Sequence, residues 1–256
     1  MEKKEGVFLQ VLAYSWVAWF VVPFVLLFVV VVARFDAVRV VAGDERFWAA
    51  FWISLSSAFV VIVLTAFFSV PVAYFLAFTK SKFRNILEAV LIDIPQTFPP
   101  VAVGVIYLFV FGVHSPINLA FTFAAVVIAK LLVSAPFTLG FLLRKFREIR
   151  ASKLDLVARS LGAGTYDLLF CVFLPLARRV LIAGLTMSWA RAMGEFGGSL
   201  IFAGVIAYHT EILPTYTNRV VGNDPFLALA ATAVLTLFAI LSIVLVRSLF
   251  DKKEVD

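Results

Sequence analysis

Long apolar runs alternate with short polar connections along most of this chain. The runs cover residues 7–33, 47–79, 87–113, 119–143, 180–207 and 226–246. A helix that rises 1.5 Å per residue needs about 20 apolar residues to cross a hydrocarbon core of roughly 30 Å, and every run reaches that length. The short alternating strands of a membrane barrel do not occur in the sequence. The pattern therefore predicts an all-α polytopic membrane protein with about six transmembrane helices.

Composition supports this class and adds two details. The 256 residues are 63% hydrophobic and 15% charged, with a mean hydropathy of +1.04, which is outside the range of soluble domains. The first run is too long for a signal peptide and lacks a small-x-small cleavage site, so we expect a retained first helix in a single transmembrane domain over residues 1–256. The single cysteine, Cys171, excludes an internal disulfide and leaves no cysteine cluster for a metal.

The positive charges predict the orientation of the helices. If the N-terminus is cytoplasmic, 16 of the 22 Lys and Arg residues fall in inner connections or tails, and only Lys130 and Arg191 lie within apolar runs. The excess of positive charge on cytoplasmic loops therefore places both termini of this multi-pass chain in the cytoplasm, below a plasma or inner membrane. The net charge of +6 then reflects topology and does not suggest nucleic acid as a partner.

The longest inner connection, residues 144–179, contains a short amphipathic pattern. Leu154, Val157 and Leu161 recur at helical spacing, and Gly162 follows as a helix stop. Such a helix could lie on the membrane surface, pack on its own bundle, or enter a groove on a partner. The charged positions beside this apolar line are Lys153, Asp155 and Arg159.

The same connection resembles the EAA loop of importer-type ABC transporter permeases. Val157 and Ala158 precede Gly162 by the family spacing, and Leu174 and Pro175 close the motif. The resemblance implies a coupling helix that sits in a cleft of a cytoplasmic ATPase subunit. The first acid of the motif is out of register, because Leu156 stands in its place and Asp155 comes one residue earlier. The implied coupling residues are Leu154, Val157, Ala158, Leu161, Gly162 and Pro175.

Two further stretches resemble oxyanion permeases. Residues 188–198, SWARAMGEFGG, followed by FAG at 202–204, are similar to the fifth helix of molybdate, tungstate and sulfate permeases, and residues 93–104 to their third helix. The resemblance implies a permease subunit that carries molybdate or tungstate. The alternative is sulfate or another oxyanion on the same scaffold. The resemblance also implies a homodimer in the membrane and an extracytoplasmic oxyanion-binding protein. This binding protein is expected to contact the polar outer loop at 208–225.

The sequence gives the chain no means of hydrolysing nucleotide. None of its nine lysines follows a glycine, so a phosphate-cradling loop of the Walker A type is absent. The chain is therefore expected to be non-catalytic and without a cofactor of its own, with ATP and magnesium bound by cytoplasmic ABC ATPase subunits. A secondary transporter or channel that runs without ATP remains the alternative from another class. The further alternative of an intramembrane enzyme is not supported, because the sequence contains no His or Cys constellation.

Two charged positions within the fifth run stand out. Arg191 and Glu195 are four residues apart, so on a helix they share one face and are predicted to pair. A charge at this depth must face protein or water. The pair either shapes the helix beside a translocation path, with Gly194 and Gly197 allowing close approach and flexing, or is a purely structural ion pair.

The third and fourth runs carry the remaining candidates for a path or gate. Lys130 lies near the middle of its run, too deep to snorkel, and either lowers the barrier to an anion or is a structural lysine bonded to carbonyls or to Glu195. Pro99, Pro100 and Gly104 predict a broken third helix near a gate, the alternative being a simple kinked helix.

Overall fold

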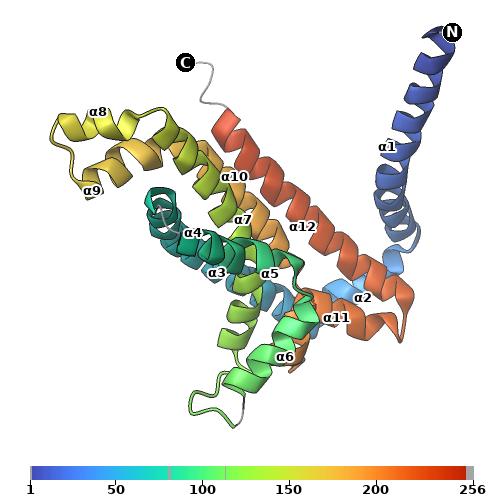
Figure 1. Ribbon diagram of the computed structural model, residues 1–256. Helices are drawn as coiled ribbons and strands as arrows, with labels where there is room; N and C mark the ends of the chain where they lie inside the picture. Colours follow the sequence, from blue (N-terminus) through green and yellow to red (C-terminus); the bar gives the residue numbers. More distant parts are fainter. Residues whose placement is uncertain (1, 80–81, 113, 252–256) are drawn as a thin grey trace.

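The computed structural model describes residues 2–79, 82–112 and 114–251, and within these ranges the chain is helical with short loops and no strand. Figure 1 shows the helices in order along the chain. The first half contains α1 (Glu2–Ala33), α2 (Phe35–Gly43), α3 (Glu45–Phe78), α4 (Lys82–Glu88), η1 (Ala89–Asp93), α5 (Ile94–Thr97) and α6 (Pro100–Phe111). The second half contains α7 (Phe123–Ala151), α8 (Leu154–Ser160), α9 (Thr165–Asp167), η2 (Leu168–Phe173), α10 (Leu174–Met193), η3 (Ser199–Ala203), α11 (Leu213–Val221) and α12 (Pro225–Asp251).

The predicted polytopic helical fold is confirmed: the described residues contain five helices long and apolar enough to span a membrane, or six if a bent pair is counted as one span. The bent pair replaces the third predicted run. Residue 113, the predicted end of that run, lies outside the described residues. The five unbroken candidates are Phe8–Ala33, Glu45–Phe78, Phe123–Ala151, Thr165–Met193 and Pro225–Val244.

The fifth span differs from the predicted run of 180–207. It begins earlier, at Thr165, and its α-helix ends at Met193. The predicted bounds came from the length of the apolar run, whereas the α-helix ends at a glycine. Gly194 caps the end of α10, helical backbone resumes at Gly197, and Gly204 adopts φ +71°, which side chains with a Cβ rarely adopt. The apolar residues after Met193 therefore form a short π-helix and a loop.

Helix α7 forms the centre of the bundle and packs against α3 and α10. Of its apolar window, 67% is buried, against none of the window of α1. Small and hydroxyl side chains face these contacts, which lets the backbones approach closely, as is common between helices in membranes. Thr138 of α7 and Ser188 of α10 share a hydrogen bond of 2.7 Å, and a Cβ at Gly184 would come within 3.0 Å of the Cα of Thr138.

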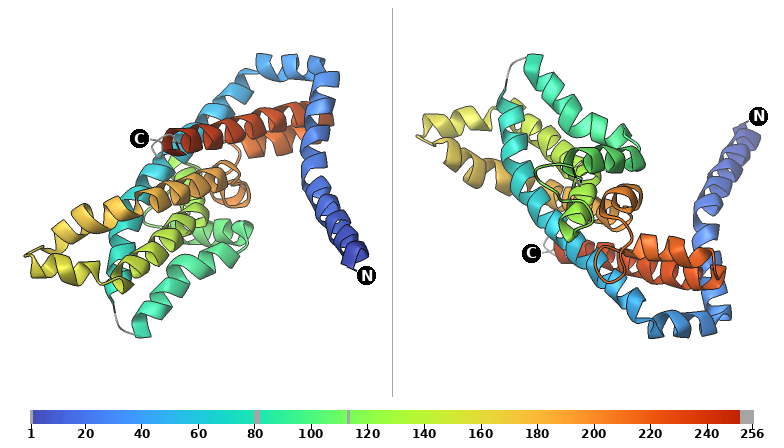
Figure 2. Two further views of the ribbon diagram at one scale, coloured as in Figure 1. Left: turned by 90° about the horizontal axis from the view of Figure 1, so that it is seen from above. Right: turned by 90° about the horizontal axis from the view of Figure 1, so that it is seen from below.

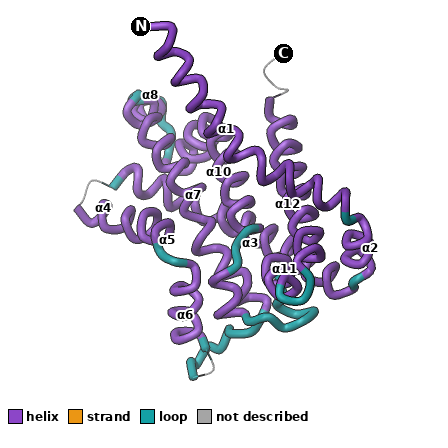
Figure 3. The backbone as a smooth tube through the Cα atoms, turned by 90° about the vertical axis from the view of Figure 1, so that its right-hand side faces the viewer, coloured by secondary structure: helices purple, strands orange, loops and turns teal. Residues whose placement is uncertain are grey.

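The remaining helices are arranged around this core. Helix α1 stands apart from the bundle and contacts it through α12 and α2 (Figure 2). The start of α1, the end of α12 and the α8 and α9 segment lie at one end of the molecule, whereas α2 and the end of α6 lie at the other (Figures 1 and 3). This arrangement places the 144–179 connection on the same side as the start of α1 and the end of α12.

Candidate functional site

Helix α8 and the turn after it have a defined backbone geometry. Lys153, with φ +62°, turns the chain out of α7, and Gly162, with φ +90°, ends α8. The N–H of Ala163 donates to the carbonyl of Ala158 at 3.0 Å, and the N–H of Gly162 donates to the carbonyl of Arg159 at 3.0 Å. This pair of bonds is the Schellman arrangement, in which the left-handed position strongly favours glycine. The fixed glycine of the predicted motif thus has a physical reason.

The predicted apolar line lies on the outside of α8. Leu154, Val157 and Leu161 are 42%, 57% and 84% exposed, and Leu156 is 58% exposed. By contrast, Asp155 is only 6% exposed and points into the bundle. Figure 1 shows α8 and α9 projecting sideways from the bundle, beyond α7 and α10. The segment therefore presents an apolar surface without a covering element among the described residues.

Two other predicted coupling residues support this segment. Ala158 packs against the core cluster that joins α3, α7 and η2. Pro175 is exposed in the first turn of α10, directly after the π-helix η2. Below them, the rings of Phe146 and Phe173 meet edge to face with centroids 5.3 Å apart. The segment thus rests on a packed aromatic base that connects it to α7 and α10.

The third span is broken at Pro99 and Pro100. Its two halves, Phe83–Thr97 and Pro100–Phe111, are inclined by 116°. Neither proline has an N–H to continue the helix, and Phe98 and Pro99 adopt extended backbone angles. The prediction of a broken helix is confirmed, and that of a simple kink is wrong.

The second half of the broken span packs very closely on the glycine-rich segment after α10. A Cβ at Gly104 would lie 2.8 Å from the carbonyl oxygen of Gly198 and 2.9 Å from Cβ of Ile201. A Cβ at Gly197 would lie 2.9 Å from Cγ2 of Val101. Both distances are shorter than real Cβ contacts allow, so these positions require glycine if the backbones keep this separation. Gly194 is exposed, and a Cβ there would meet only Ala190 O at 3.6 Å.

The predicted pair of Arg191 and Glu195 does not form. The α-helix ends at Met193, so the four-residue spacing no longer places both side chains on one face. The Glu195 carboxylate, 1% exposed, instead accepts bonds from the N–H of Gly198 at 2.7 Å and the N–H of Ser199 at 3.2 Å, and from the hydroxyl of Ser199. Among the described residues, Arg191 has neither a hydrogen bond nor an ion pair with it.

Lys130 lies in the middle of the bundle and is fully buried. Its Nζ atom donates to the carbonyl oxygen of Ser54 at 3.1 Å and to Oγ of Ser57 at 2.8 Å. Both acceptors belong to α3, and the Glu195 carboxylate is near enough to act on the ammonium group electrostatically. The alternative of a lysine bonded to carbonyls therefore matches the geometry.

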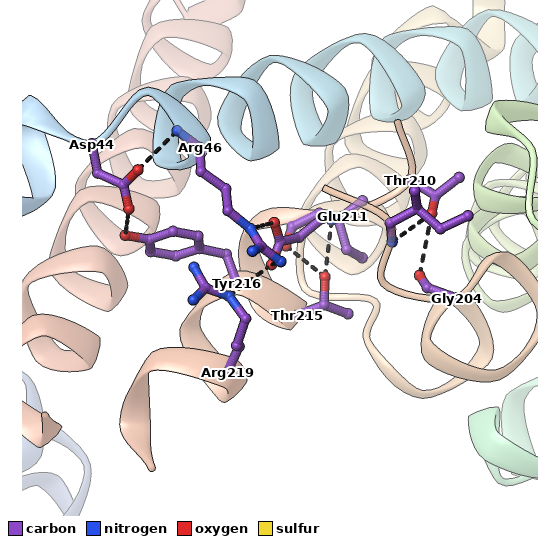
Figure 4. A network of polar contacts seen from close by, with 10 residues as sticks. Asp44, Arg46, Gly204, Thr210, Glu211, Thr215, Tyr216 and Arg219 are labelled. Carbon is purple, nitrogen blue, oxygen red and sulfur yellow. Dashed lines mark hydrogen bonds and ion pairs between the residues drawn. The ribbon is translucent and has the colours of Figure 1, made fainter. Parts of the chain in front are cut away.

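A polar network near the loop between η3 and α11 was not predicted from the sequence (Figure 4). Arg46 holds Glu211 with two bonds, Nε to Oε2 at 2.5 Å and Nη2 to Oε1 at 3.0 Å, and Arg219 donates to the same carboxylate at 3.1 Å. Glu211 is 0% exposed. Beside it, the hydroxyl of Tyr216 donates to Asp44 Oδ2 at 2.7 Å. The sequence signal was two arginines and one acid in predicted outer connections, which alone does not indicate contact across 165 residues.

These features define a class of protein: a helical membrane component with a broken third span and a projecting α8 surface. Residues 69–254, most of the chain, match the family model described as the inner membrane component of binding-protein-dependent transport systems, and the chain belongs to this family. It is therefore a permease subunit of an ABC-type importer, which confirms the resemblance of the 144–179 connection.

The chain is similar to several curated permeases. It is 31% identical over 243 residues to the molybdenum transport system permease protein ModB of Mycobacterium tuberculosis, which covers 87% of this chain and 90% of the relative. It is 30% identical over 187 residues to the molybdate/tungstate transport system permease protein WtpB of Thermococcus kodakarensis, covering 73% of each. It is also 28% identical over 213 residues to the sulfate permease CysW of a Synechocystis strain, covering 79% and 76%.

Solved structures share the fold. A bacterial ABC transporter that imports the acidic polysaccharide alginate aligns with a TM-score of 0.77 at 14% identity, covering 99% of this chain and 98% of that one. A second alginate transporter structure, in complex with a periplasmic protein bound to an alginate pentasaccharide, aligns with a TM-score of 0.76 at 15% identity, covering 95% and 93%. At these identities the likeness concerns the fold.

Proposed function

We propose that this permease subunit carries molybdate or tungstate across the cell membrane, driven by ATP that partner subunits hydrolyse. The observation that carries the proposal is the combination of the glycine-rich segment with the broken third span, because the stretches that resemble oxyanion permeases are the ones packed together there. The relatives named for molybdenum and tungstate transport support it. A sulfate permease is the second candidate, since the relative named for sulfate covers a similar share of the chain.

The partners follow from the family and from the exposed surfaces. Two copies of the chain would form the membrane dimer, with residues 1–256 as one permease domain, and both termini would lie in the cytoplasm beside α8. Cytoplasmic ABC ATPases, holding ATP and magnesium, would receive α8 through Leu154, Val157 and Leu161, with Gly162, Ala158 and Pro175 fixing the segment. An extracytoplasmic oxyanion-binding protein would dock at the opposite end, and the alginate transporter of similar fold was solved in complex with a periplasmic protein.

The geometry supports a route for coupling. Closure of the ATPases would move α8, which continues into α7 on one side and through η2 into α10 on the other. These two helices pack along each other. Helix α10 ends at the glycine-rich segment, where Gly197 and Gly104 make the close contacts with α6. Movement of α10 would therefore reach the break at Pro99 and Pro100 directly.

The charged side chains of this region receive different roles. Glu195 would hold η3 in shape through its bonds to Gly198 and Ser199. Lys130 would hold α3 and α7 together behind the gate. Arg191, half-buried and unpaired with Glu195, is the better candidate for contact with an anion. Gly194 would contribute flexibility at the end of α10.

The test is uptake by the complete complex in proteoliposomes, with tungstate, molybdate and sulfate in competition. ATP-dependent accumulation of tungstate or molybdate that excess sulfate leaves unchanged is the expected result. Accumulation of sulfate in preference to both would replace the proposal by the second candidate. Transport without ATP or without an ATPase subunit would contradict the proposal as a whole.

A further inference from the structure

The projecting surface of α8 has an unusual distribution of charge. Its centre is apolar, formed by exposed leucine and valine side chains, and its only acid is turned inward. We call it the coupling surface, and it consists of Lys153, Leu154, Leu156, Val157, Arg159, Leu161 and Tyr166.

The acids near the coupling surface are all engaged within the chain. Asp155 is 6% exposed and lies on the inner side of α8, near enough to Tyr74 of α3 to act on it electrostatically. Asp167 accepts a bond of 2.8 Å from the N–H of Gly164 and so closes the turn before α9. Glu148 accepts a bond of 2.7 Å from Lys145. The coupling surface therefore offers a partner no carboxylate from α8.

Cations, in contrast, lie at both ends of α8. Lys153 precedes α8 and Arg159 lies in its last turn, and both residues are exposed. Arg159 shares the inner side of α8 with Asp155 and interacts with the hydroxyl of Tyr74, so Lys153 is the cation directed towards a partner. The ammonium group of Lys153 has no hydrogen bond or ion pair within the described part of the chain. A partner that covers the apolar centre must also meet the charge of Lys153, because a cation brought out of water without a counter-charge is strongly unfavourable.

We infer that the ATPase cleft that receives α8 is apolar at its floor and carries carboxylates at its rim, facing Lys153. This inference rests on the proposed function, which supplies the ATPase as the occupant. By charge complementarity, the positive charge beside α8 is expected to meet negative charge on the ATPase. The EAA-type motif has a glutamate at position 156, and an acid there would favour a basic group on the partner. Leu156 is uncharged and favours an apolar contact instead.

The first experiment changes the charge at the centre of the surface. The tagged complex is purified from membranes, and the amount of ATPase subunit per chain is measured for the wild type, Leu156→Glu and Leu156→Gln. Leu156→Glu is expected to lower the bound ATPase by about tenfold or more, because its charge faces the apolar floor and acidic rim. The neutral Leu156→Gln controls for polarity alone and is expected to retain more ATPase. A second control, Arg39→Glu, changes the charge of an exposed residue in α2 at the opposite end and is expected to leave ATPase binding unchanged.

The second experiment detects the carboxylates directly. A carbodiimide joins a lysine ammonium group to a carboxylate in contact with it, and the products are mapped by mass spectrometry. A cross-link between Lys153 and an Asp or Glu of the ATPase is expected, and Lys153→Arg should abolish it while keeping the charge. The contact between Lys145 and Glu148, at 2.7 Å, provides a positive control within the chain.

The outcomes separate this inference from the proposed function. If the wild-type chain co-purifies with no ATPase, the proposed function fails. If the ATPase is bound, but Leu156→Glu binds as well as the wild type or better and Lys153 forms no cross-link, the acidic rim is wrong and the proposed function stands. Size-exclusion profiles of all variants check that each is folded, so that loss of ATPase is read only from intact permease.

Discussion

Glu195 accepts a hydrogen bond of 2.7 Å from the backbone N–H of Gly198, three residues further along the chain. Its carboxylate also accepts from Ser199, so it caps the start of η3 as an acid caps the N-terminus of a helix. This engagement satisfies a side chain that is 1% exposed without a cation from the same helix. Arg191 is consequently left available for another role.

The first prediction concerns the independence of these two residues. The stability effects of Arg191→Ala and Glu195→Ala are expected to add in the double variant to within about 0.5 kcal/mol, as for side chains that share no interaction. Thermal or chemical unfolding of the detergent-solubilised complex, monitored by tryptophan fluorescence, provides the measurement. A coupling energy well above this value would show that the pair forms after all.

The pair of Arg46 and Glu211 is the matched control for this double-mutant comparison. Their two bonds of 2.5 and 3.0 Å join residues far apart in sequence, and Glu211 is fully buried. The corresponding double-mutant cycle is expected to give a coupling of about 1 kcal/mol or more. The contrast between the two cycles guards against an assay too insensitive to detect an ion pair.

The second prediction compares two glycines of the same segment. Gly197→Ala is expected to impair both folding yield and uptake, because its Cβ would lie 2.9 Å from Val101 Cγ2 and 3.1 Å from the Val101 nitrogen. Overpacking of this kind costs about 1–3 kcal/mol. Gly194→Ala is the control for folding yield and thermal stability, since its Cβ would make only an ordinary contact at 3.6 Å. Equal folding yield and thermal stability of the two variants would refute the close-approach argument.

Much of the fold could be predicted from the sequence, because apolar length acts over whole spans. The helical polytopic class, the break at Pro99 and Pro100 and the exposed line through Leu154, Val157 and Leu161 follow from such local signals. Proline removes a donor and helical spacing defines a face wherever the helix is placed. These predictions needed no knowledge of which helices are neighbours.

The side-chain partners could not be predicted in the same way. The predicted pairing of Arg191 with Glu195 assumed a helix that continues through Gly194, but α10 ends at Met193 and Gly194 caps it. The acceptors of Lys130 lie 73 and 76 residues away on α3. Only the packing of α7 against α3 brings these groups together. Spacing along one helix therefore predicts a shared face only while that helix lasts.

The third prediction concerns Lys130. Lys130→Met is expected to destabilise the chain by about 1–3 kcal/mol, because two buried hydrogen bonds to α3 are lost. Uptake per folded complex should remain, since the ammonium group is fully enclosed by the bundle. Ser57→Ala removes one acceptor and leaves the carbonyl of Ser54, so its effect on stability should be smaller. Loss of uptake by a fully stable Lys130→Met complex would instead place Lys130 in the path.

The fourth prediction follows from the hydrogen bond of Tyr216 to Asp44. Burial, together with this bond and the nearby negative charge, raises the pKa of the Tyr216 hydroxyl above its ordinary value of about 10. Because the folded pKa is the higher one, the stabilisation is complete below pH 10 and is lost as the pH rises towards the folded pKa. Wild-type stability should therefore fall more steeply above about pH 10 than that of Tyr216→Phe. Parallel unfolding curves between pH 8 and 11 for both proteins would contradict it.

The fifth prediction tests the turn that ends α8. Gly162→Ala keeps the apolar surface but places a Cβ at φ +90°, a backbone conformation that costs about 1–2 kcal/mol for residues other than glycine. If the turn relaxes, α8 shifts against its aromatic base, and ATPase bound per chain should fall about fivefold to thirtyfold. Gly162→Asn should lose less, because asparagine tolerates the left-handed region better. Gly222→Ala, where a Cβ meets nothing within 4 Å, should bind ATPase as the wild type does. No atom of the described chain contacts the position of the missing Cβ at Gly162, so within the chain an effect there would arise from backbone geometry and not from crowding.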